Sequence, residues 1–335
     1  MSASRRVPIF ENSEQSYQAD TCRPLRRAVA EGSLDFAACV HGHYPGAPLP
    51  PDTLPGLKSV GYWDAKHEQQ WGLDWHRNEG VELTFCSAGS LAFAAEQHEF
   101  ELGTDDLTIT RPWQQHRVGA PWVGPSRLHW VILDVGVRRP DQPWRWPAWV
   151  VLSREDLEEL TTCLRHNEYP VLRSATALRE CFEGLAAAVR ECPNRQPESS
   201  LAVLLNQLLL QLLTLLRASA RPLDRSLSES RRTVRLFLDD LQISLELLSR
   251  EWCANSMAAA CGLGATQFSK YCRELVNSSP IQFLQHARLE AAAKLLKERP
   301  DLSVTQVAHR VGFASSQYFA TLFRQRFGAA PSERR

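Results

Sequence analysis

The stretch VGFASSQYFATLFRQRFG, residues 311–328, decides how the C-terminal part of this chain folds. Its aromatic and aliphatic residues recur every three or four positions, which is the spacing of one face of an α-helix. The opposite face carries small or hydrogen-bonding side chains, namely Ser316, Gln317, Ala320, Thr321 and Arg324. Such side chains can approach base edges or phosphates closely, so this outer face is expected to contact nucleic acid.

A second helix is expected directly upstream, in SVTQVAHRVG. Ser303 can cap its N-terminus, and Gln306 can complete a capping box. Gly312 then supplies the tight turn that leads into the helix of the opening stretch. A helix, a short glycine turn and a second helix form the helix-turn-helix pattern, whose second helix enters the DNA major groove.

The same pattern occurs once more, in NSMAAACGLGATQFSKYCREL from residue 255 onward. Gly262 and Gly264 mark the turn, as glycines do between two periodic segments. The helix that follows carries polar residues on its outer side, namely Thr266, Ser269, Lys270 and Arg273. The C-terminal part is therefore expected to hold two helix-turn-helix units.

A long helix is expected to connect the two units. Ser279 as N-cap, Pro280 at the first helical position and Gln282 at the third mark a helix start, and the helix should run to about Glu298. Its length would be roughly 28 Å at ~1.5 Å per residue. Because one DNA turn is ~34 Å, this helix could hold two recognition helices in successive major grooves.

Residues 226–335 resemble the DNA-binding domain of AraC/XylS-type transcriptional regulators. The run VAHRVGFASSQYFATLFRQRFGAAPSERR carries the resemblance, through Gly312, Phe313, Ser315, Tyr318, Phe319, Phe323, Arg324, Phe327, Gly328 and Pro331. The resemblance implies base contacts by Thr266, Ser269, Lys270, Ser316, Gln317 and Thr321, and phosphate contacts by Arg273, Arg324 and Arg326. The first unit departs from the pattern at Cys272, where a large apolar residue is usual, and at Gly264, where a serine cap is common.

Charge and cysteine content agree with this interpretation. The net charge is zero, but the residues from Arg250 onward hold 12 Lys and Arg against 6 Asp and Glu, which leaves 26 against 32 upstream. A basic C-terminal part on an acidic body suits a protein that meets phosphates with one end only. Nine cysteines without a CxxC pair indicate reduced thiols in a cytoplasm rather than a disulfide framework or a zinc ribbon.

Upstream, residues 59–152 show short apolar stretches such as VELTF and LHWVILDV, divided by Gly, Pro and Asn. This pattern predicts several short strands in a sandwich or small barrel. Residues 1–58 are expected to be a loop-like extension with one short helix at Arg23–Glu31. The N-terminus MSASRRVPIFENSEQ has no apolar segment after its two arginines, so no signal peptide is expected.

The stretch WHRNEGVELTFCSAGSL resembles the first motif of cupin-type sensor barrels, with Asn78 in place of a second histidine. In RPWQQH, His116 stands about where the second cupin motif has its own histidine. Strand alternation would let a barrel lumen gather His76, Glu82 and His116. Such a set could bind a divalent transition metal, line a polar effector pocket or make only structural hydrogen bonds. Because the set is incomplete, no metal or other cofactor is predicted.

Nine of the ten tryptophans lie between Trp63 and Trp149. A tryptophan presents a flat apolar face and one N–H donor, which suits a sugar ring or an aromatic ligand. Trp75, Trp113 and Trp130 adjoin the histidine-bearing strands and are predicted to line the effector pocket. The alternative is that most tryptophans belong to the barrel core.

Residues 153–225 have helical periodicity, and the run LAVLLNQLLLQLLTLL from Leu201 to Leu216 steps its leucines by four and three positions. That spacing fits either a buried helix of the body or a dimer seam, and both interpretations stay open. The run is 16 residues long and contains three polar residues, Asn206, Gln207 and Gln211. It is therefore expected to be too short and too polar to cross a bilayer.

The sequence thus predicts an α+β multidomain protein with four parts: an extension (1–58), a cupin-like β-barrel (59–152), a helical dimerisation and linker region (153–225) and the DNA-binding domain (226–335). The expected function is ligand-responsive, sequence-specific regulation of transcription, and no catalytic activity is expected. Activation is expected rather than repression, because it is the more common mode in such regulators. The expected partners are double-stranded DNA, a small molecule for which a sugar is one candidate, RNA polymerase and a second copy of the chain, with no membrane. The alternative is a metal-dependent cupin enzyme with an accessory DNA-binding tail.

Overall fold

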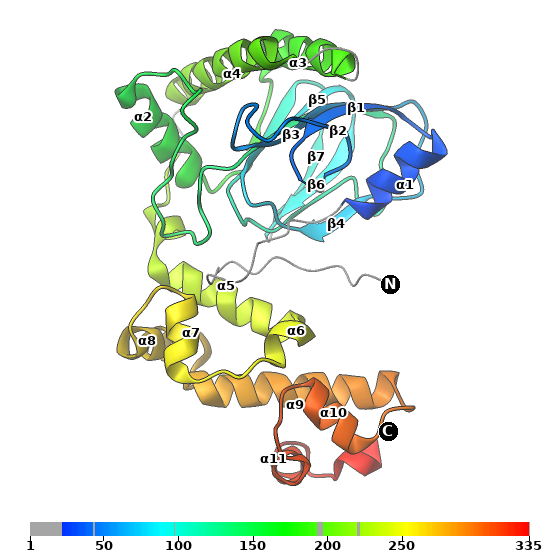
Figure 1. Ribbon diagram of the computed structural model, residues 1–335, viewed down its shortest axis with the longest axis vertical. Helices are drawn as coiled ribbons and strands as arrows, with labels where there is room; N and C mark the ends of the chain where they lie inside the picture. Colours follow the sequence, from blue (N-terminus) through cyan, green and yellow to red (C-terminus); the bar gives the residue numbers. More distant parts are fainter. Residues whose placement is uncertain (1–21, 43, 97, 193–196, 220–221, 335) are drawn as a thin grey trace. The chain divides into compact units, whose positions relative to one another are not determined.

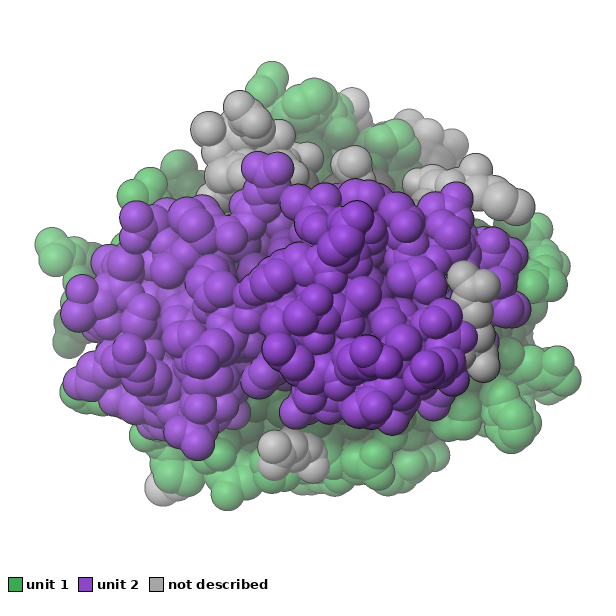
Figure 2. Space-filling model, turned by 90° about the horizontal axis from the view of Figure 1, so that it is seen from below, with its two compact units in different colours: residues 1–7, 17–228 green, residues 8–16, 229–335 purple. Residues whose placement is uncertain are grey.

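The computed structural model describes residues 22–42, 44–96, 98–192, 197–219 and 222–334. The described residues form two compact units, which divide between Ser228 and Glu229. Figure 1 labels their helices and strands, and Figure 2 distinguishes the two units by colour. Unit 1 contains all the described strands, whereas unit 2 is helical.

Two β-sheets make up most of unit 1. The seven-stranded sheet has the order β11-β8-β5-β10-β3-β1-β2 and the four-stranded sheet the order β4-β9-β6-β7. The strands are β1 (Asp35–Val40), β2 (Ala47–Pro48), β3 (Leu57–Ala65), β4 (Leu73–His76), β5 (Val81–Gly89), β6 (Leu91–Ala95), β7 (His98–Leu102), β8 (Asp106–Thr110), β9 (His116–Val118), β10 (Ser126–Leu133) and β11 (Val171–Leu172). Among the described strands, β2, β11, β4 and β7 remain edges, so pairing does not close the sheets into the expected barrel.

The N-terminal segment differs in one respect from the sequence-based prediction. The short helix α1 (Arg23–Glu31) has the predicted bounds, but Asp35–Val40 forms β1 where a loop was expected. Its sequence DFAACV is rich in small residues and lacks apolar-polar alternation, so it carries little strand signal. Pairing with β3 over all six residues, rather than local propensity, makes this segment a strand.

Three α-helices complete unit 1: α2 (Arg154–Arg165), α3 (Arg179–Glu191) and α4 (Glu198–Ala218). Helix α4 buries Leu201, Leu205, Leu208 and Leu212, which are four members of the predicted seam. The seam therefore packs inside unit 1, as the buried-helix interpretation predicts. The helix has 21 residues, more than expected, and is long and apolar enough to cross a membrane by length and composition alone. The core helix of a soluble protein passes the same test, and the buried leucine face fits that case.

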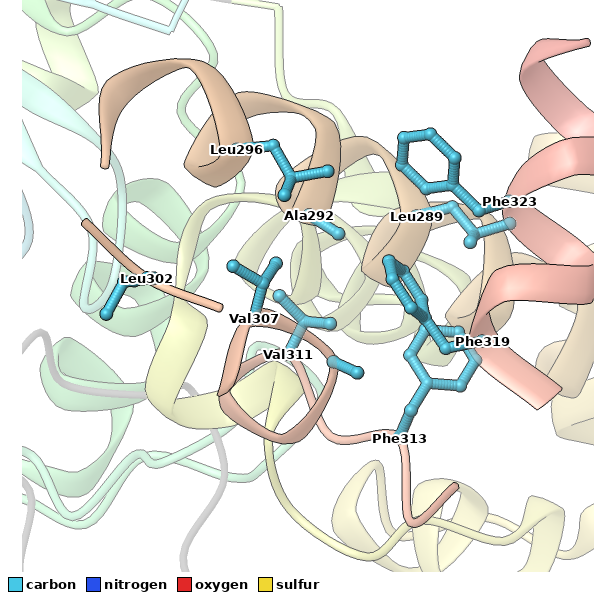
Figure 3. Close-up of a cluster of buried hydrophobic side chains, with 10 residues drawn as sticks. Leu289, Ala292, Leu296, Leu302, Val307, Val311, Phe313, Phe319 and Phe323 are labelled. Atoms are coloured by element: carbon cyan, nitrogen blue, oxygen red, sulfur yellow. The ribbon is translucent and has the colours of Figure 1, made fainter. Parts of the chain in front are cut away.

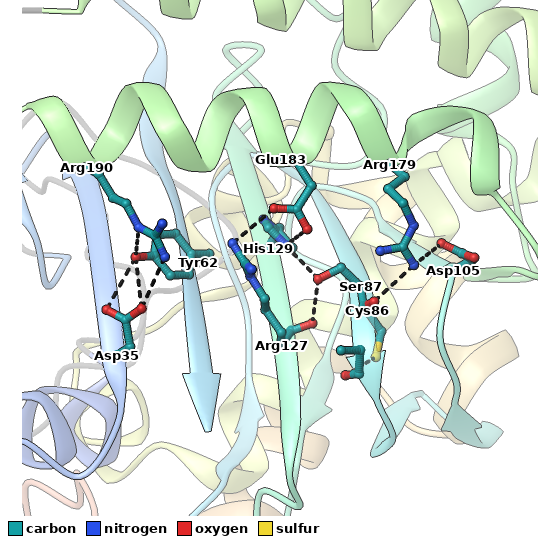
Figure 4. A network of polar contacts seen from close by, with 11 residues as sticks. Asp35, Tyr62, Cys86, Ser87, Asp105, Arg127, His129, Arg179, Glu183 and Arg190 are labelled. Carbon is teal, nitrogen blue, oxygen red and sulfur yellow. Dashed lines mark hydrogen bonds and ion pairs between the residues drawn. The ribbon is translucent and has the colours of Figure 1, made fainter. Parts of the chain in front are cut away.

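Helix α3 packs on the seven-stranded sheet through a layer of polar contacts, drawn in Figure 4. Phe182 stacks on Phe85 of β5 with ring centroids 5.0 Å apart. The ionic and hydrogen-bonded pairs around this stack are Arg190 with Asp35 and Tyr62, Arg127 with Glu183, Arg179 with Asp105, and Ser87 with His129. Since side chains alternate along each strand, the neighbouring residues of β3, β5 and β10 point away from α3, toward the second sheet.

Unit 2 consists of α5 (Ser230–Ile243), α6 (Leu245–Leu248), α7 (Ala254–Ala260), α8 (Ala265–Val276), α9 (Pro280–Glu298), α10 (Val304–Arg310) and α11 (Ser316–Phe327). One apolar cluster joins α9, α10 and α11 and is shown in Figure 3. Phe313, Phe319 and Phe323 form its aromatic part, with successive ring centroids 5.2 and 5.4 Å apart. This cluster fixes the second helix-turn-helix unit to α9.

Candidate nucleic-acid interface and N-terminal cavity

Helix α11 has the two faces that its sequence predicts. Phe319 and Phe323 are buried, whereas Gln317, Thr321 and Arg324 are exposed and Ser316 is half-buried. The Ser315 side chain accepts a hydrogen bond from the backbone N–H of Tyr318 and so caps the helix. The predicted contact residues thus share one open side of a capped helix.

Among the described residues, Gln317 and Thr321 of this face form local hydrogen bonds. The Thr321 hydroxyl donates to the Gln317 carbonyl at 3.1 Å, and the Gln317 side-chain oxygen accepts from the Ser315 hydroxyl at 3.1 Å. Exposed hydrogen bonds between neutral groups contribute little net stability. They can therefore be exchanged for contacts to a base edge at small cost.

Helix α8 presents a comparable face in the first unit. Thr266, Lys270 and Arg273 are exposed, and Ser269 is half-buried. Gly264 is the N-cap and offers no side chain to cap the helix. The unusual Cys272 is fully buried, and burial raises the pKa of its thiol to about 11, so it stays neutral and packs as a small apolar group.

The cationic residues of the two faces differ in their partners. Lys270 lies 3.9 Å from Glu274, and Arg326 forms a 3.0 Å ion pair with Glu290 of α9. Neither Arg273 nor Arg324 has an ion-pair partner within the part of the chain that the structure describes. The guanidinium groups of these two arginines are therefore more available for phosphate contacts than the charged groups of Lys270 and Arg326.

Helix α9 has the predicted bounds, and the predicted capping box of Ser303 with Gln306 is present. Ser279 and Gln282, predicted as a helix start, form a second capping box. From its middle, Arg288 donates to the backbone carbonyls of Leu248 at 3.0 Å and Arg250 at 2.6 Å. Its guanidinium also lies over the Phe313 ring, 5.9 Å from the centroid. Arg288 thus ties together segments on either side of α9.

Sequence reasoning missed Arg288 as a structural residue. The stretch RLEAAAKLL, residues 288–296, also contains Glu290 and Lys294, so nothing in the sequence singles out Arg288. Gly312 adjoins this connection: its φ is +96°, and a Cβ there would meet Leu248 and Arg288. Helix α11 gains a further tie to α9 because the Gln285 amide donates to the Tyr318 hydroxyl at 2.9 Å.

A cavity of about 30 Å³ lies between the two sheets of unit 1. Its walls include His76, Glu82 and Trp130, which were predicted to line the effector pocket, and also Tyr44 and Trp63, which were not. A water molecule needs ~10–15 Å³ of such volume, so the cavity has room for about two waters. A larger ligand would have to displace part of the wall.

The predicted polar cluster lies partly in the wall of this cavity: His76 and Glu82 line it, whereas His116 contacts Glu82 without being a wall residue. Ligand atoms of His76, Glu82 and His116 all lie within 4.8 Å of one another, and His116 Nε2 is 2.9 Å from Glu82 Oε2. Burial raises the pKa of Glu82, but the two imidazoles and the Asn78 amide outweigh this effect and lower it overall. Glu82 is therefore an ionised, buried carboxylate.

The histidine tautomers limit what the cluster can do. Nδ1 of His76 and of His116 must donate, since each faces a backbone carbonyl, that of Asp74 at 2.7 Å or Gln114 at 2.9 Å. The short contact between His116 Nε2 and Glu82 is then attractive only with a second proton on the ring or with a cation between them. Two imidazoles and a carboxylate could hold a divalent transition metal, although Glu82 Oε2 already accepts a 2.7 Å hydrogen bond from Asn78.

The remaining predicted pocket residues lie away from the cavity walls. Trp113 is fully buried, and its indole N–H donates to the Val137 carbonyl at 2.7 Å. Trp75 is half-buried, and the Arg117 guanidinium lies over its ring, 5.1 Å from the ring centroid. Among the described residues, therefore, these two tryptophans do not line the cavity. Tyr44 gave no sequence signal because it stands in the proline-rich stretch HGHYPGAPLPPDTLPG, residues 41–56.

Known proteins resemble this chain most clearly at its C-terminal end. Residues 257–335 match a family described as a helix-turn-helix domain. The HTH-type transcriptional regulator MtrA of Neisseria gonorrhoeae is 36% identical over 85 residues, which are 25% of this chain and 28% of MtrA. The HTH-type transcriptional activator RhaS of Klebsiella pneumoniae is 33% identical over 127 residues, 38% of this chain and 43% of RhaS.

A longer similarity extends into unit 1. The MmsAB operon regulatory protein of Pseudomonas aeruginosa is 27% identical over 292 residues, which are 85% of this chain and 83% of that protein. The matches to MtrA and RhaS, by contrast, cover less than half of either protein. Together with the two pairs of helices, α7 with α8 and α10 with α11, these findings identify residues 257–335 as a helix-turn-helix domain of the kind found in AraC/XylS-type transcription regulators.

Proposed function

We propose that this chain is a sequence-specific, DNA-binding transcription regulator that responds to a small molecule. The observation that carries the proposal is the pair of exposed polar faces on α8 and α11, joined by the single capped helix α9. Base contacts would come from Thr266, Ser269, Lys270, Ser316, Gln317 and Thr321, and phosphate contacts from Arg273, Arg324 and Arg326.

The cavity of unit 1 is the proposed effector site. Trp130 and Trp63 supply flat apolar faces, and His76 and Glu82 supply polar groups that can fix the orientation of a ligand. A sugar remains one candidate, because such ligands combine apolar ring faces with hydroxyl groups. Since the present volume holds about two waters, binding of any sugar requires the cavity to enlarge. Unit 1 would then have two arrangements, with a small and an enlarged cavity, and a ligand that binds the enlarged one would shift the protein toward it.

The proposal also covers partners, location and oligomeric state. The regulator would act in the cytoplasm as a homodimer, with RNA polymerase as a partner, and activation is the more common mode in such regulators. Val203 and Leu210 are 66% and 49% exposed on α4, so this helix keeps an outer apolar strip beside its buried leucine face. The proposed assembly uses unit 1 as the regulatory part and unit 2 as the DNA-binding part.

A footprint of the purified full chain on DNA upstream of its own and neighbouring genes tests the proposal. Two protected segments per protomer, one helical turn apart, are expected, and protection should weaken steeply between low and moderate salt. Absence of protection at low salt, both alone and with extracts of small metabolites, would refute the DNA-binding assignment.

The rival proposal is a metal-dependent cupin enzyme, and the cluster of His76, Glu82 and His116 is the observation that favours it. Metal analysis of protein purified without chelator separates the two. About one bound divalent metal per chain, lost in a His116→Asn variant, would favour the enzyme. A content near zero, with DNA protection, would favour the regulator.

A further inference from the structure

Residues 222–228, which end unit 1, are attached to the C-terminal end of α2. Leu223 forms a β-bridge with Asn167, and the backbone N–H of Asp224 donates to the His166 carbonyl at 2.9 Å. The Ser228 hydroxyl donates to the Arg225 carbonyl, so it must accept from His166 Nε2, 3.1 Å away. These contacts hold the segment that leads into the DNA-binding unit.

Arg111 connects this attachment to the seven-stranded sheet. It directly follows β8, and its guanidinium donates to the Asn167 carbonyl and forms a 3.2 Å ion pair with Glu96. Its side chain is only 8% exposed. A buried charge-assisted hydrogen bond to a carbonyl is stronger than one between neutral groups. The position of Asn167 therefore depends on where the end of β8 lies.

The end of β8 is in turn coupled to the cavity. Thr110, the residue before Arg111, is paired directly with Glu82 of β5, and its hydroxyl lies 3.5 Å from Glu82 Oε2. Since neighbouring residues point to opposite sides, Thr110 can contact Glu82, which lines the cavity, while Arg111 reaches Asn167. A ligand that draws Glu82 or Thr110 toward itself would therefore move Arg111.

The attached arrangement also has a built-in cost. Asn167 is 4% exposed, and neither its side-chain nitrogen nor its side-chain oxygen has a hydrogen-bond partner within the described residues. A buried polar group without a partner is destabilising, and such groups recur where a structure stores strain. Release of the segment would expose this amide to water and recover part of that cost. The attachment is therefore poised to open.

We propose that Arg111, Asn167 and His166 form a latch through which the cavity controls residues 222–228. In the latched state Arg111 holds the Asn167 carbonyl, and residues 222–228 stay on α2. A ligand that reorganises Glu82 and Thr110 shifts β8, weakens the Arg111 contact and releases the segment before unit 2. This inference rests on the proposed regulatory function and specifies how the effector site would act.

Hydrogen exchange of the full chain, followed by mass spectrometry, tests the latch without knowledge of the effector. The probe is the exchange rate of peptides that cover residues 222–228 in Arg111→Met, Glu82→Gln and the double variant. Arg117→Met is the control, since it removes another arginine–carboxylate ion pair of unit 1, the 2.6 Å contact between Arg117 of β9 and Glu99.

Arg111→Met should speed exchange in residues 222–228 by at least ~10-fold, as expected for loss of a charge-assisted hydrogen bond. Glu82→Gln should change the same rates at least threefold, and the double variant should fall short of the product of the two effects, since both act on one contact. The control should stay within about twofold of the wild type.

Unchanged rates in Glu82→Gln, or independent effects in the double variant, would overturn the latch. If Arg111→Met does not fold, Ser228→Ala replaces it, because it removes the acceptor of His166 with little change in packing. A footprint on the same proteins separates the two proposals. Coupled exchange without DNA protection would refute the regulator but keep the latch, and DNA protection without coupling would do the reverse.

Discussion

Gly312 provides the sharpest test of how unit 2 is built. Its φ is +96°, and a Cβ placed there would lie 2.7 Å from both the Leu248 carbonyl oxygen and a guanidinium nitrogen of Arg288. Left-handed backbone costs a residue with a side chain ~1–2 kcal/mol. Overpacking against a backbone atom adds ~1–3 kcal/mol, because the carbonyl cannot turn aside as a side chain could. We therefore expect Gly312→Ala to reduce the free energy of unfolding by about 3 kcal/mol.

Two other glycines of unit 2 serve as controls. Gly328 has φ +73° with no atom within 4 Å of a Cβ position, so Gly328→Ala should cost only the conformational term, about 1 kcal/mol. Gly264 has ordinary φ of −74° and open space, so Gly264→Ala should be nearly neutral or slightly stabilising. The three variants thus separate backbone strain from the close approach.

The measurement is thermal unfolding of the full chain, followed by far-ultraviolet circular dichroism. For a unit of this size 1 kcal/mol corresponds to roughly 4–8 °C, so Gly312→Ala should lower the midpoint of the unit 2 transition by roughly 12–24 °C. Equal losses for Gly312→Ala and Gly328→Ala would refute the close approach to Leu248 and Arg288, since backbone strain alone would then explain both.

Three further predictions concern the DNA face and unit 1. Gln317→Ala or Thr321→Ala should alter sequence preference and cost ~1–3 kcal/mol on the best site, and an unchanged preference in a selection experiment would contradict base contact. Arg324→Ala should weaken binding to all DNA sequences and lower the salt slope of binding by about one. Arg326→Ala should lower that slope less, because Arg326 is already paired with Glu290. A loss confined to certain sites in Arg324→Ala would mean that Arg324 reads bases. Burial lowers the pKa of His129 to about 3, and Arg127 and Arg179 add to this effect. The fold therefore needs His129 neutral, and its contribution to the free energy of unfolding is fully present above the ordinary pKa of 6.5. That contribution is lost as the pH falls from 6.5 toward 3. Urea titrations should show the stability falling by up to ~1.4 kcal/mol per pH unit in that window, and His129→Gln should remove this part of the slope.

Features governed by short-range chemistry could be predicted from the sequence. The start of α9 follows from Ser279, Pro280 and Gln282, which lie within one helical turn, and its bounds are as predicted. Ligand atoms of His76, Glu82 and His116 lie within 4.8 Å of one another, as the barrel hypothesis expected. Strand alternation bears only on the side that each residue faces, because β4, β5 and β9 meet through long-range sheet topology. The DNA-contact residues stay predictions, although their exposure on α8 and α11 is as expected.

Features that depend on distant contacts could not be predicted. Arg288 bonds to carbonyls 38 and 40 residues away, and no local pattern reports such a partner. Trp113 was predicted to line the pocket because it adjoins a histidine-bearing strand, but its φ is +66° and it lies in a turn, where strand alternation does not set the direction of a side chain. For the same reason β1 escaped notice, since the strand exists through its neighbour β3 rather than through its own residues.

Under the proposed function, the 19-residue helix α9, capped at its start and held from its middle by Arg288, has a consequence for the evolution of the target promoters. A connector that does not bend reads the number of base pairs between two sites but is indifferent to their identity. Inserting one base pair would rotate the second site by about 34° around the duplex axis and carry it out of reach of α11. Substitutions should therefore accumulate freely between the two recognised segments, whereas insertions and deletions there should be removed by selection.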